Sequence, residues 1–215
     1  MPVEIDEDTK KHVKEMFDDL RSDVRILFFH CDKNCVVCDT TLDLLKEVAK
    51  LSGKVSIEKH DCKKDEAKAK ELGVKRHPTT IIVGERDYGV RYSGIPSGYE
   101  FGPFVESIVD VSKGEAYLGD DTLKRLRKLG KPVDIKVFVM PTCPYCPAMV
   151  RLAHRLAVAS NRIRSEMIES IEFRDMALEY SVTAVPKTVI NDKVEVVGLQ
   201  PESEFVDSIF KAVKS

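Results

Sequence analysis

The sequence predicts an α/β protein made of two copies of one domain, each a mixed central sheet flanked by helices. Its 215 residues suffice for two domains of about 100 residues. Each half carries a Cys-x-x-Cys motif, beginning at Cys35 and at Cys143. A proline follows each motif 43 positions later, at Pro78 and at Pro186. This shared spacing, together with alternating strand and helix patterns, predicts a duplicated α/β domain.

In the first copy, the spacing of apolar residues separates helices from strands. Val13, Met16 and Leu20 recur at helical intervals, and the apolar run over residues 25–30 indicates a buried strand. The Cys pair then opens a helix, and Pro78 introduces a strand that continues into a hairpin. Strands are predicted over 25–30, 55–61, 80–83 and 87–92, and helices over 6–21, after the Cys pair, over 65–72 and over 101–111.

The second copy repeats this order after a boundary near residues 112–119. Leucines at helical spacing in 123–129 indicate a short helix that stops at Gly130. Strands are predicted over 134–140, 167–173, 188–190 and 194–197, and helices from Cys143 to about 160 and over 202–213. We therefore expect two domains, 1–115 and 116–215.

Composition excludes several classes of function. The formal net charge is -2 and the charges are interspersed, unlike the basic patch of a nucleic-acid-binding protein. No apolar run approaches the roughly 20 residues that cross a membrane. The acidic N-terminal segment is not followed by the apolar stretch of a secretory signal. We expect no nucleic-acid partner, no membrane partner and a cytoplasmic location.

Charge and amide content also indicate the habitat. Charged residues make up 33% of the chain, and its amides are Asn34, Asn161, Asn191 and Gln200. High charge with few thermolabile amides is typical of thermophiles; drift in a charged cytosolic protein is the alternative. Intracellular proteins of hyperthermophiles tolerate structural disulfides, which is compatible with the six cysteines of this chain.

Each Cys-x-x-Cys pair is predicted to be a catalytic redox site. Cys143 follows an apolar strand and is expected to cap the next helix, with Pro144 in the first helical position. Free N–H groups and the helix dipole there lower a thiol pKa and produce the nucleophile. Cys146 lies one turn further on the same face, where it can resolve a mixed disulfide. Cys35 and Cys38 have the same arrangement.

A metal site is the alternative to redox pairs. Cys31, Cys35 and Cys38 could ligate an iron–sulfur cluster with Cys62, or the two pairs could share a zinc ion. Zinc ribbons separate their pairs by about 15–20 residues, whereas 104 residues lie between Cys38 and Cys143. We therefore expect no metal and no cofactor.

The order of strand, Cys-x-x-Cys helix, strand, helix and then a proline before a hairpin resembles the thioredoxin fold. That family has a cis-proline beside its cysteines, and Pro78 and Pro186 match its position. The resemblance implies that His77 and Val185, the preceding residues, expose backbone groups that pair with an extended substrate peptide. A trans-proline turn is the alternative, but the matched spacing favours the cis form.

Two such folds in tandem resemble the protein disulfide oxidoreductases of hyperthermophilic archaea and bacteria. Segments 141–147, 88–92 and 108–112 carry the resemblance most specifically. It implies reduction, formation and isomerisation of disulfides in protein or peptide substrates, in the manner of protein disulfide isomerase, with a thioredoxin-reductase-like electron donor. The dipeptide Pro144-Tyr145 is also that of glutaredoxins.

Two other functions stay open at this point. The chain could be an electron-transfer module that reduces a peroxiredoxin-type partner, although such modules generally keep one active Cys pair. It could also be a peptide-binding chaperone without catalysis. His30, His77 and Asp61 are weaker candidates for proton transfer at the first site, because polar lining is the more usual role of such residues.

Cys31 and Cys62 are predicted to form a third, structural disulfide. They follow two strands that would be parallel neighbours about 4.8 Å apart, so their Cα separation could suit a disulfide. Val139 and Ser170 occupy the matching sequence positions in the second copy, where no equivalent bond can form. Two buried free thiols, or exchange between Cys31 and Cys35, are the alternatives.

Overall fold

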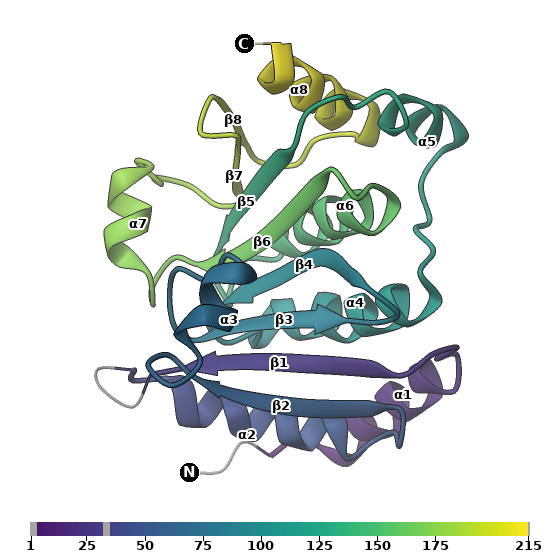
Figure 1. Cartoon of the computed structure of the whole chain (residues 1–215), viewed down its shortest axis with the longest axis vertical. Coiled ribbons are helices and arrows are strands. Elements are labelled where there is room, and N and C mark those ends of the chain that lie inside the picture. Colours follow the sequence, from purple (N-terminus) through teal and green to yellow (C-terminus); the bar gives the residue numbers. More distant parts are fainter. Residues whose placement is uncertain (1–3, 32–34, 215) are drawn as a thin grey trace.

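The computed structural model describes residues 4–31 and 35–214. Its strands are β1 (Val24–His30), β2 (Val55–Asp61), β3 (Thr79–Val83), β4 (Asp87–Ser93), β5 (Val133–Val139), β6 (Ile163–Glu169), β7 (Lys187–Ile190) and β8 (Val194–Val197). They form one eight-stranded mixed sheet in the order β2-β1-β3-β4-β6-β5-β7-β8. In Figure 1 the strands of the first copy occupy the lower part of this sheet and those of the second copy the upper part.

Helices cover the sheet on both faces. They are α1 (Glu7–Phe17), α2 (Cys38–Ala49), α3 (Glu66–Glu71), α4 (Phe101–Lys113), α5 (Asp120–Leu126), α6 (Cys146–Ala159), α7 (Arg174–Glu179) and α8 (Glu202–Lys214), with a 3₁₀ turn η1 (Gly98–Glu100) before α4. In Figure 1, α2, α4 and α6 lie behind the sheet and α3 lies in front of it. The predicted mixed α/β architecture, a central sheet flanked by helices, is confirmed.

Alternation along the strands explains why both faces are covered. In β1, Ile26 and Phe28 are buried in the large core under α2 and α4. Leu27 and Phe29 point to the other face and are buried in a smaller cluster with Ala69 of α3. A strand that is apolar on both faces is stable only when both are shielded from water.

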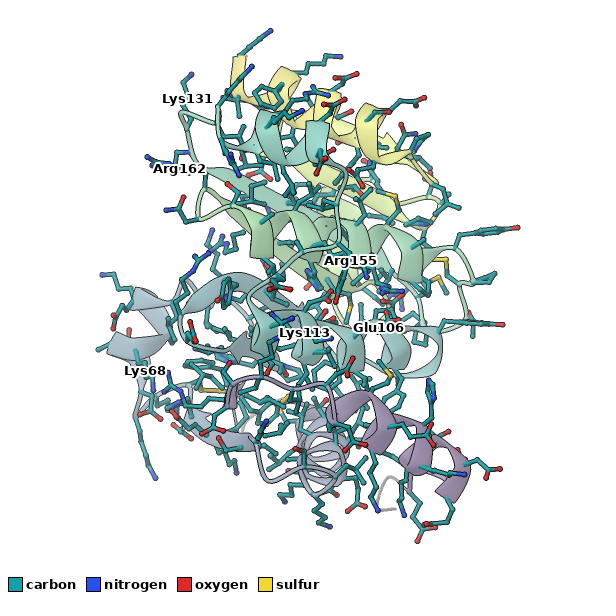
Figure 2. The ribbon with its side chains drawn as sticks, turned by 90° about the vertical axis from the view of Figure 1, so that its right-hand side faces the viewer. Lys68, Glu106, Lys113, Lys131, Arg155 and Arg162 are labelled. Carbon is teal, nitrogen blue, oxygen red and sulfur yellow. A yellow bond between two sulfur atoms is a disulfide. The ribbon has the colours of Figure 1, made fainter. Side chains whose placement is uncertain are left out.

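The two halves of the chain, α1 to α4 and α5 to α8, share one sheet because β4 pairs with β6 in parallel. At this junction Glu166 of β6 is buried and accepts hydrogen bonds from Arg76 and from the Ser93 hydroxyl, both in the first half. Behind the sheet, α4 packs on α6, and Figure 2 shows Glu106 of α4 near Arg155 of α6. The halves are therefore joined in both the sheet and the helix layer.

Two features of the second half differ from the sequence prediction. The strand expected over 167–173 is β6, at Ile163–Glu169, and the helix α7 that follows was not predicted. The polar Ser165 and Glu166 obscured the start of this strand, but β6 lies between β4 and β5 in the sheet, so both residues are buried. The repeated sequence pattern also does not predict that the strands of the two copies join in one sheet.

The predicted division into 1–115 and 116–215 lies in the segment between α4 and α5. Gly114 ends α4 with a φ of 61°, a left-handed conformation that glycine adopts without strain. The structure does not establish separate domains, so the division stays a prediction.

No helix of the described residues is long and apolar enough to cross a membrane.

Candidate redox sites

Both Cys-x-x-Cys motifs lie at the same edge of the sheet. β1 is antiparallel to β3 and β3 to β4, so β1 and β4 run in the same direction. β4, β6 and β5 are mutually parallel. The carboxyl ends of β1 and β5, which lead into the two motifs, therefore meet at one edge, on the left in Figure 1 where the arrowheads of β1 and β4 point.

At the second site, Cys143 and Cys146 are joined by a disulfide, with Cα atoms 5.5 Å apart. Cys143 is 8% exposed, and Cys146 is completely buried at the start of α6. The backbone N–H of Cys146 points at Sγ of Cys143 over 3.1 Å. A sulfur at this place would be stabilised as a thiolate by the helix N-terminus.

The start of this helix corrects the expected position of Cys143. α6 begins at Cys146 with Tyr145 as its N-cap, so Cys143 lies in the turn before the helix and Pro144 is not the first helical residue. Pro147 takes a place in the first turn instead, where the missing N–H of a proline costs little. The Tyr145 side chain is 62% exposed beside the disulfide.

The proline loop of the second half lies directly against this disulfide. The Val185–Pro186 peptide bond is cis, and the carbonyl oxygen of Val185 is 3.7 Å from Sγ of Cys143. The N–H of Gly198 donates to the Pro186 carbonyl over 2.8 Å, which holds the loop. The sequence-predicted residues of the second site are thus brought together.

At the first site, Cys35 and Cys38 are joined by a disulfide with Cα atoms 5.4 Å apart. Cys38 is buried at the start of α2, whereas Cys35 is partly exposed and Val36 is 94% exposed. The His77–Pro78 peptide bond is cis, as in the other half. Each pair therefore has one more exposed and one more buried cysteine.

Both halves of the chain line the cavity beside the first site. It has a volume of about 360 Å³. The first half supplies residues 35–37 of the Cys-x-x-Cys segment and the cis-proline segment 77–78, and the second half supplies part of the segment between β6 and α7. The lining residues are Cys35, Val36, Val37, His77 and Pro78 from the first half, and Ile171, Glu172 and Phe173 from the second.

A second cavity, of about 390 Å³, adjoins the second site. Met140 and Val185 line it close to Cys143, and α7 forms another wall with the exposed Leu178. Ile171 lines both cavities. The segment between β6 and α7 therefore stands between the two redox sites.

Two of the polar residues expected near the first site are poorly suited to take up a proton at neutral pH. Burial lowers the pKa of His77, and its Nδ1 has no hydrogen-bond partner among the described residues. Asp61 accepts backbone N–H groups of Lys64 and Lys63, which lower its pKa. His30 is also buried at the end of β1.

Two carboxyls, one on the buried Glu100 and one on the half-buried Glu172, were not found from the sequence. Burial raises the pKa of Glu100 to about 8 and that of Glu172 to about 7. Glu100 is 1% exposed, and neither of its carboxylate oxygens has a hydrogen-bond partner among the described residues. It belongs to η1, where the N–H of Tyr99 donates to the carbonyl of Pro141 over 3.0 Å, just before the second motif.

No sequence signal distinguished these acids from ordinary surface glutamates. Glu100 stands at the entry of an amphipathic helix, where an exposed first-turn acid is common. Its burial depends on contact with the other half of the chain, which the repeat does not predict.

The remaining two cysteines are also bonded to each other. Cys31 and Cys62 form a disulfide with Cα atoms 5.1 Å apart. Val139 was expected to be the counterpart of Cys31 in the second half, and this is corrected. Cys31 is the first residue after β1, which ends at His30, whereas β5 ends at Val139, so the first residue after β5 is Met140.

The part of the chain that the structure describes contains no group of three or more His, Cys, Asp or Glu arranged to hold a metal ion.

Comparisons with known proteins agree with this arrangement. A family model described as a thioredoxin domain matches residues 133–211. The solved protein disulfide oxidoreductase from Aeropyrum pernix is 31% identical with a TM-score of 0.91, and the match covers 99% of this chain and 95% of that one. The NTD_N/C domain of alkylhydroperoxide reductase AhpF from Enterococcus faecalis is 24% identical with a TM-score of 0.89, and the match covers 96% of this chain and 100% of that one. This second likeness shows the fold alone.

Curated relatives match most of the chain over a small part of their own length. The F subunit of alkyl hydroperoxide reductase from Staphylococcus aureus is 28% identical over 151 residues, which are 69% of this chain and 27% of that protein. An NADH dehydrogenase from Bacillus subtilis is 27% identical over 158 residues, 71% of this chain and 28% of that protein. The chain therefore spans less than a third of the length of these relatives.

Proposed function

This chain belongs to the family of thioredoxin-fold protein disulfide oxidoreductases, and on that premise we propose that it exchanges disulfides with protein or peptide substrates at two sites. The observation that carries the proposal is the pairing of each Cys-x-x-Cys with a cis-proline loop. The clearest instance is the Val185 carbonyl 3.7 Å from Sγ of Cys143. An extended peptide that pairs with the backbone at this loop would bring its own disulfide to that sulfur.

The proposed reaction begins with the more exposed cysteine of each pair. The Cys143 thiolate attacks a substrate disulfide, forms a mixed disulfide and releases one substrate thiolate. Cys146, once deprotonated, attacks Cys143 Sγ and releases the second substrate thiolate, which leaves the Cys143–Cys146 disulfide. Two electrons pass from the protein to the substrate, and two protons, one from the Cys146 thiol and one from water, end on the substrate sulfurs. Cys35 and Cys38 have the corresponding roles at the first site.

A buried resolving thiol needs a proton acceptor. Glu100 is suited to this role at the second site, because its unpaired carboxyl is on η1, which packs on α6 and on the segment before Cys143. A carboxyl with a pKa of about 8 can both take and return a proton near neutral pH.

Reduction of insulin by dithiothreitol tests this function. We expect the protein to accelerate the reduction, and replacement of all four motif cysteines by serine to abolish the acceleration. The Cys31 and Cys62 pair stays intact in that variant and serves as the internal control for the fold. A variant without the motif cysteines that is as fast as the parent would refute catalysis and favour the chaperone.

The two sites are proposed to be inequivalent. Pro144-Tyr145 separates the second pair of cysteines and Val36-Val37 the first, so different groups surround the sulfurs. A difference of about 30 mV in potential corresponds to roughly 1.4 kcal/mol. We expect the second site, with the glutaredoxin-like dipeptide, to contribute more reductase activity. Equal insulin-reduction rates for the two single-site variants would reject this ranking.

Electron transfer to a peroxiredoxin-type partner is the second candidate function. The similarity to the F subunit of alkyl hydroperoxide reductase favours it, whereas the presence of two intact motifs favours general disulfide exchange. Peroxide consumption by a peroxiredoxin, measured with this protein as the only reductant carrier, separates the two. A thioredoxin-reductase-like donor, a cytoplasmic location, a thermophilic source and the structural role of the Cys31–Cys62 bond stay predictions.

A further inference from the structure

We propose that Glu172, contributed by the second half of the chain, is the proton-transfer residue of the first redox site. The inference rests on the proposed disulfide exchange at Cys35 and Cys38, and it assigns to that site a group from outside its own Cys-x-x-Cys fold. Three observations carry it: the shared cavity, the anchoring of the carboxyl and its charge environment.

The topology of the sheet brings Glu172 to the first site. Glu172 follows β6, whose carboxyl end lies at the same edge as those of β1 and β4. It lines the 360 Å³ cavity together with Cys35 and His77. A carboxyl in this cavity has access to the space in which the first site's sulfurs exchange with a substrate.

The carboxyl is held against the proline loop of the first half. Its Oε1 accepts the N–H of Ile95 over 3.0 Å, and the neighbouring Gly94 donates its N–H to the carbonyl of Pro78 over 3.1 Å. A Cβ atom at Gly94 would lie 2.8 Å from Oε2 of Glu172, so the carboxyl packs closely on this backbone. Two hydrogen bonds through adjacent residues thus connect Glu172 to the cis-proline loop.

One carboxylate oxygen is left for chemistry. Oε2 of Glu172 is buried and has no hydrogen-bond partner among the described residues. Leaving a buried polar atom unpaired is unfavourable, and such an atom beside a reactive site can accept and donate a proton.

Partial burial keeps this carboxyl ready to exchange a proton at neutral pH. Burial raises its pKa to about 7, opposed by the Ile95 N–H and supported by the negative charge of Glu169 on β6. The other titratable groups that line the cavity are His77, whose pKa is lowered by burial, and Cys35. Glu172 is thus half ionised near pH 7, where a general acid–base group is most effective.

The proposed step moves one proton in each direction. After Cys35 has formed a mixed disulfide with the substrate, Glu172 carboxylate takes the proton of the Cys38 thiol. The Cys38 thiolate attacks Cys35 Sγ, the Cys35–substrate bond breaks, and the substrate leaves as a thiolate. The protonated Glu172 then gives its proton to that thiolate and returns to the carboxylate. No further reactant is needed.

The test uses the full chain with the second site silenced by Cys143→Ser and Cys146→Ser. In this background Glu172→Gln is expected to slow insulin reduction at pH 7 by about a hundredfold, the low end for loss of acid–base catalysis. It should also remove the part of the pH–rate profile that titrates near 7. Glu172→Asp should keep that titration. Alkylation of Cys35 against pH separates the thiol's own titration from that of the carboxyl.

Controls separate the failure of this inference from other failures. Glu179→Gln, at an exposed position of α7, should leave rate and profile unchanged. Glu172→Gln in a chain with the first site silenced should keep second-site activity, which shows that the fold is intact. An unchanged pH profile in Glu172→Gln would refute the role of Glu172 alone. Absence of activity in the silenced parent would instead refute the proposed function of the first site.

Discussion

At the residue scale, two acids near the redox sites have carboxylate oxygens that are buried without a hydrogen-bond partner among the described residues. Glu100 and Glu172 both have a raised pKa because burial disfavours the charged carboxylate. A protein tolerates such groups at a cost in stability, and they are concentrated at functional sites. This cost provides a test that does not depend on any enzymatic assay.

Glu100→Gln is predicted to change the pH dependence of stability. The unfolded carboxyl titrates near its ordinary value of 4.5 and the folded one at about 8. Between these values the folded state binds the proton and the unfolded state does not, so the free energy of unfolding falls as pH rises, by at most about 1.4 kcal/mol per unit. Urea unfolding of oxidised protein at pH 5 and pH 8 should show this loss in the parent and a smaller loss in the variant.

The control for that measurement is Glu85→Gln, at an exposed position. It should keep the parental difference between pH 5 and pH 8. If Glu100→Gln and Glu85→Gln behave alike, Glu100 does not carry a raised pKa.

The sequence predicted the cysteines and the prolines but not these acids. Cys35, Pro78 and their counterparts are identified by residue type and spacing, and both can be read directly from the sequence. The environment of Glu100 and Glu172 is created by segments of the opposite half, so their burial follows from tertiary packing that no local pattern encodes.

At the element scale, the ends of β1 and β2 are joined by the Cys31–Cys62 disulfide. This crosslink lies at the same edge as the first redox site but on the far side of β1 from the second half. Only the first half has it, which suits a structural crosslink better than a step shared by both sites.

Cys31→Ser with Cys62→Ser is predicted to lower the free energy of unfolding. For a loop of 31 residues, the chain-entropy model gives at most about 3.7 kcal/mol. Insulin reduction at the second site should be unaffected. Mass spectrometry of non-reduced peptides should first show the Cys31–Cys62 crosslink in the parent. Alkylatable thiols at both positions in the oxidised protein would contradict the structural disulfide.

At the scale of the whole molecule, the two copies share one eight-stranded sheet. Glu166 shows why this was missed: a charged residue in the middle of a strand pattern is typical of a loop, yet it is buried and paired with Arg76 of the other half. The repeat predicted the fold of each copy, whereas the β4–β6 pairing depends on a contact that only the assembled sheet contains.

Glu166→Ala is predicted to destabilise the junction strongly, because it leaves Arg76, whose side chain is only 15% exposed, without its partner. Loss of one member of a buried pair costs about 3–5 kcal/mol, measured here by denaturant unfolding. Glu58→Ala is the control, because its pairs with Arg25 and Lys68 are much more exposed and each such pair contributes about 1 kcal/mol or less. If Glu166→Ala and Glu58→Ala lower the free energy of unfolding equally, the junction does not depend on Glu166.

Disulfide exchange at both sites is most directly tested by trapping. In a chain with Cys38→Ser and Cys146→Ser, a mixed disulfide cannot be resolved. After reaction with a disulfide-bonded peptide, intact-mass measurement should find two peptides on each chain, and peptide mapping should place them on Cys35 and Cys143. A chain that captures no peptide, or captures it equally well after Cys35 and Cys143 are also replaced by serine, would contradict the account.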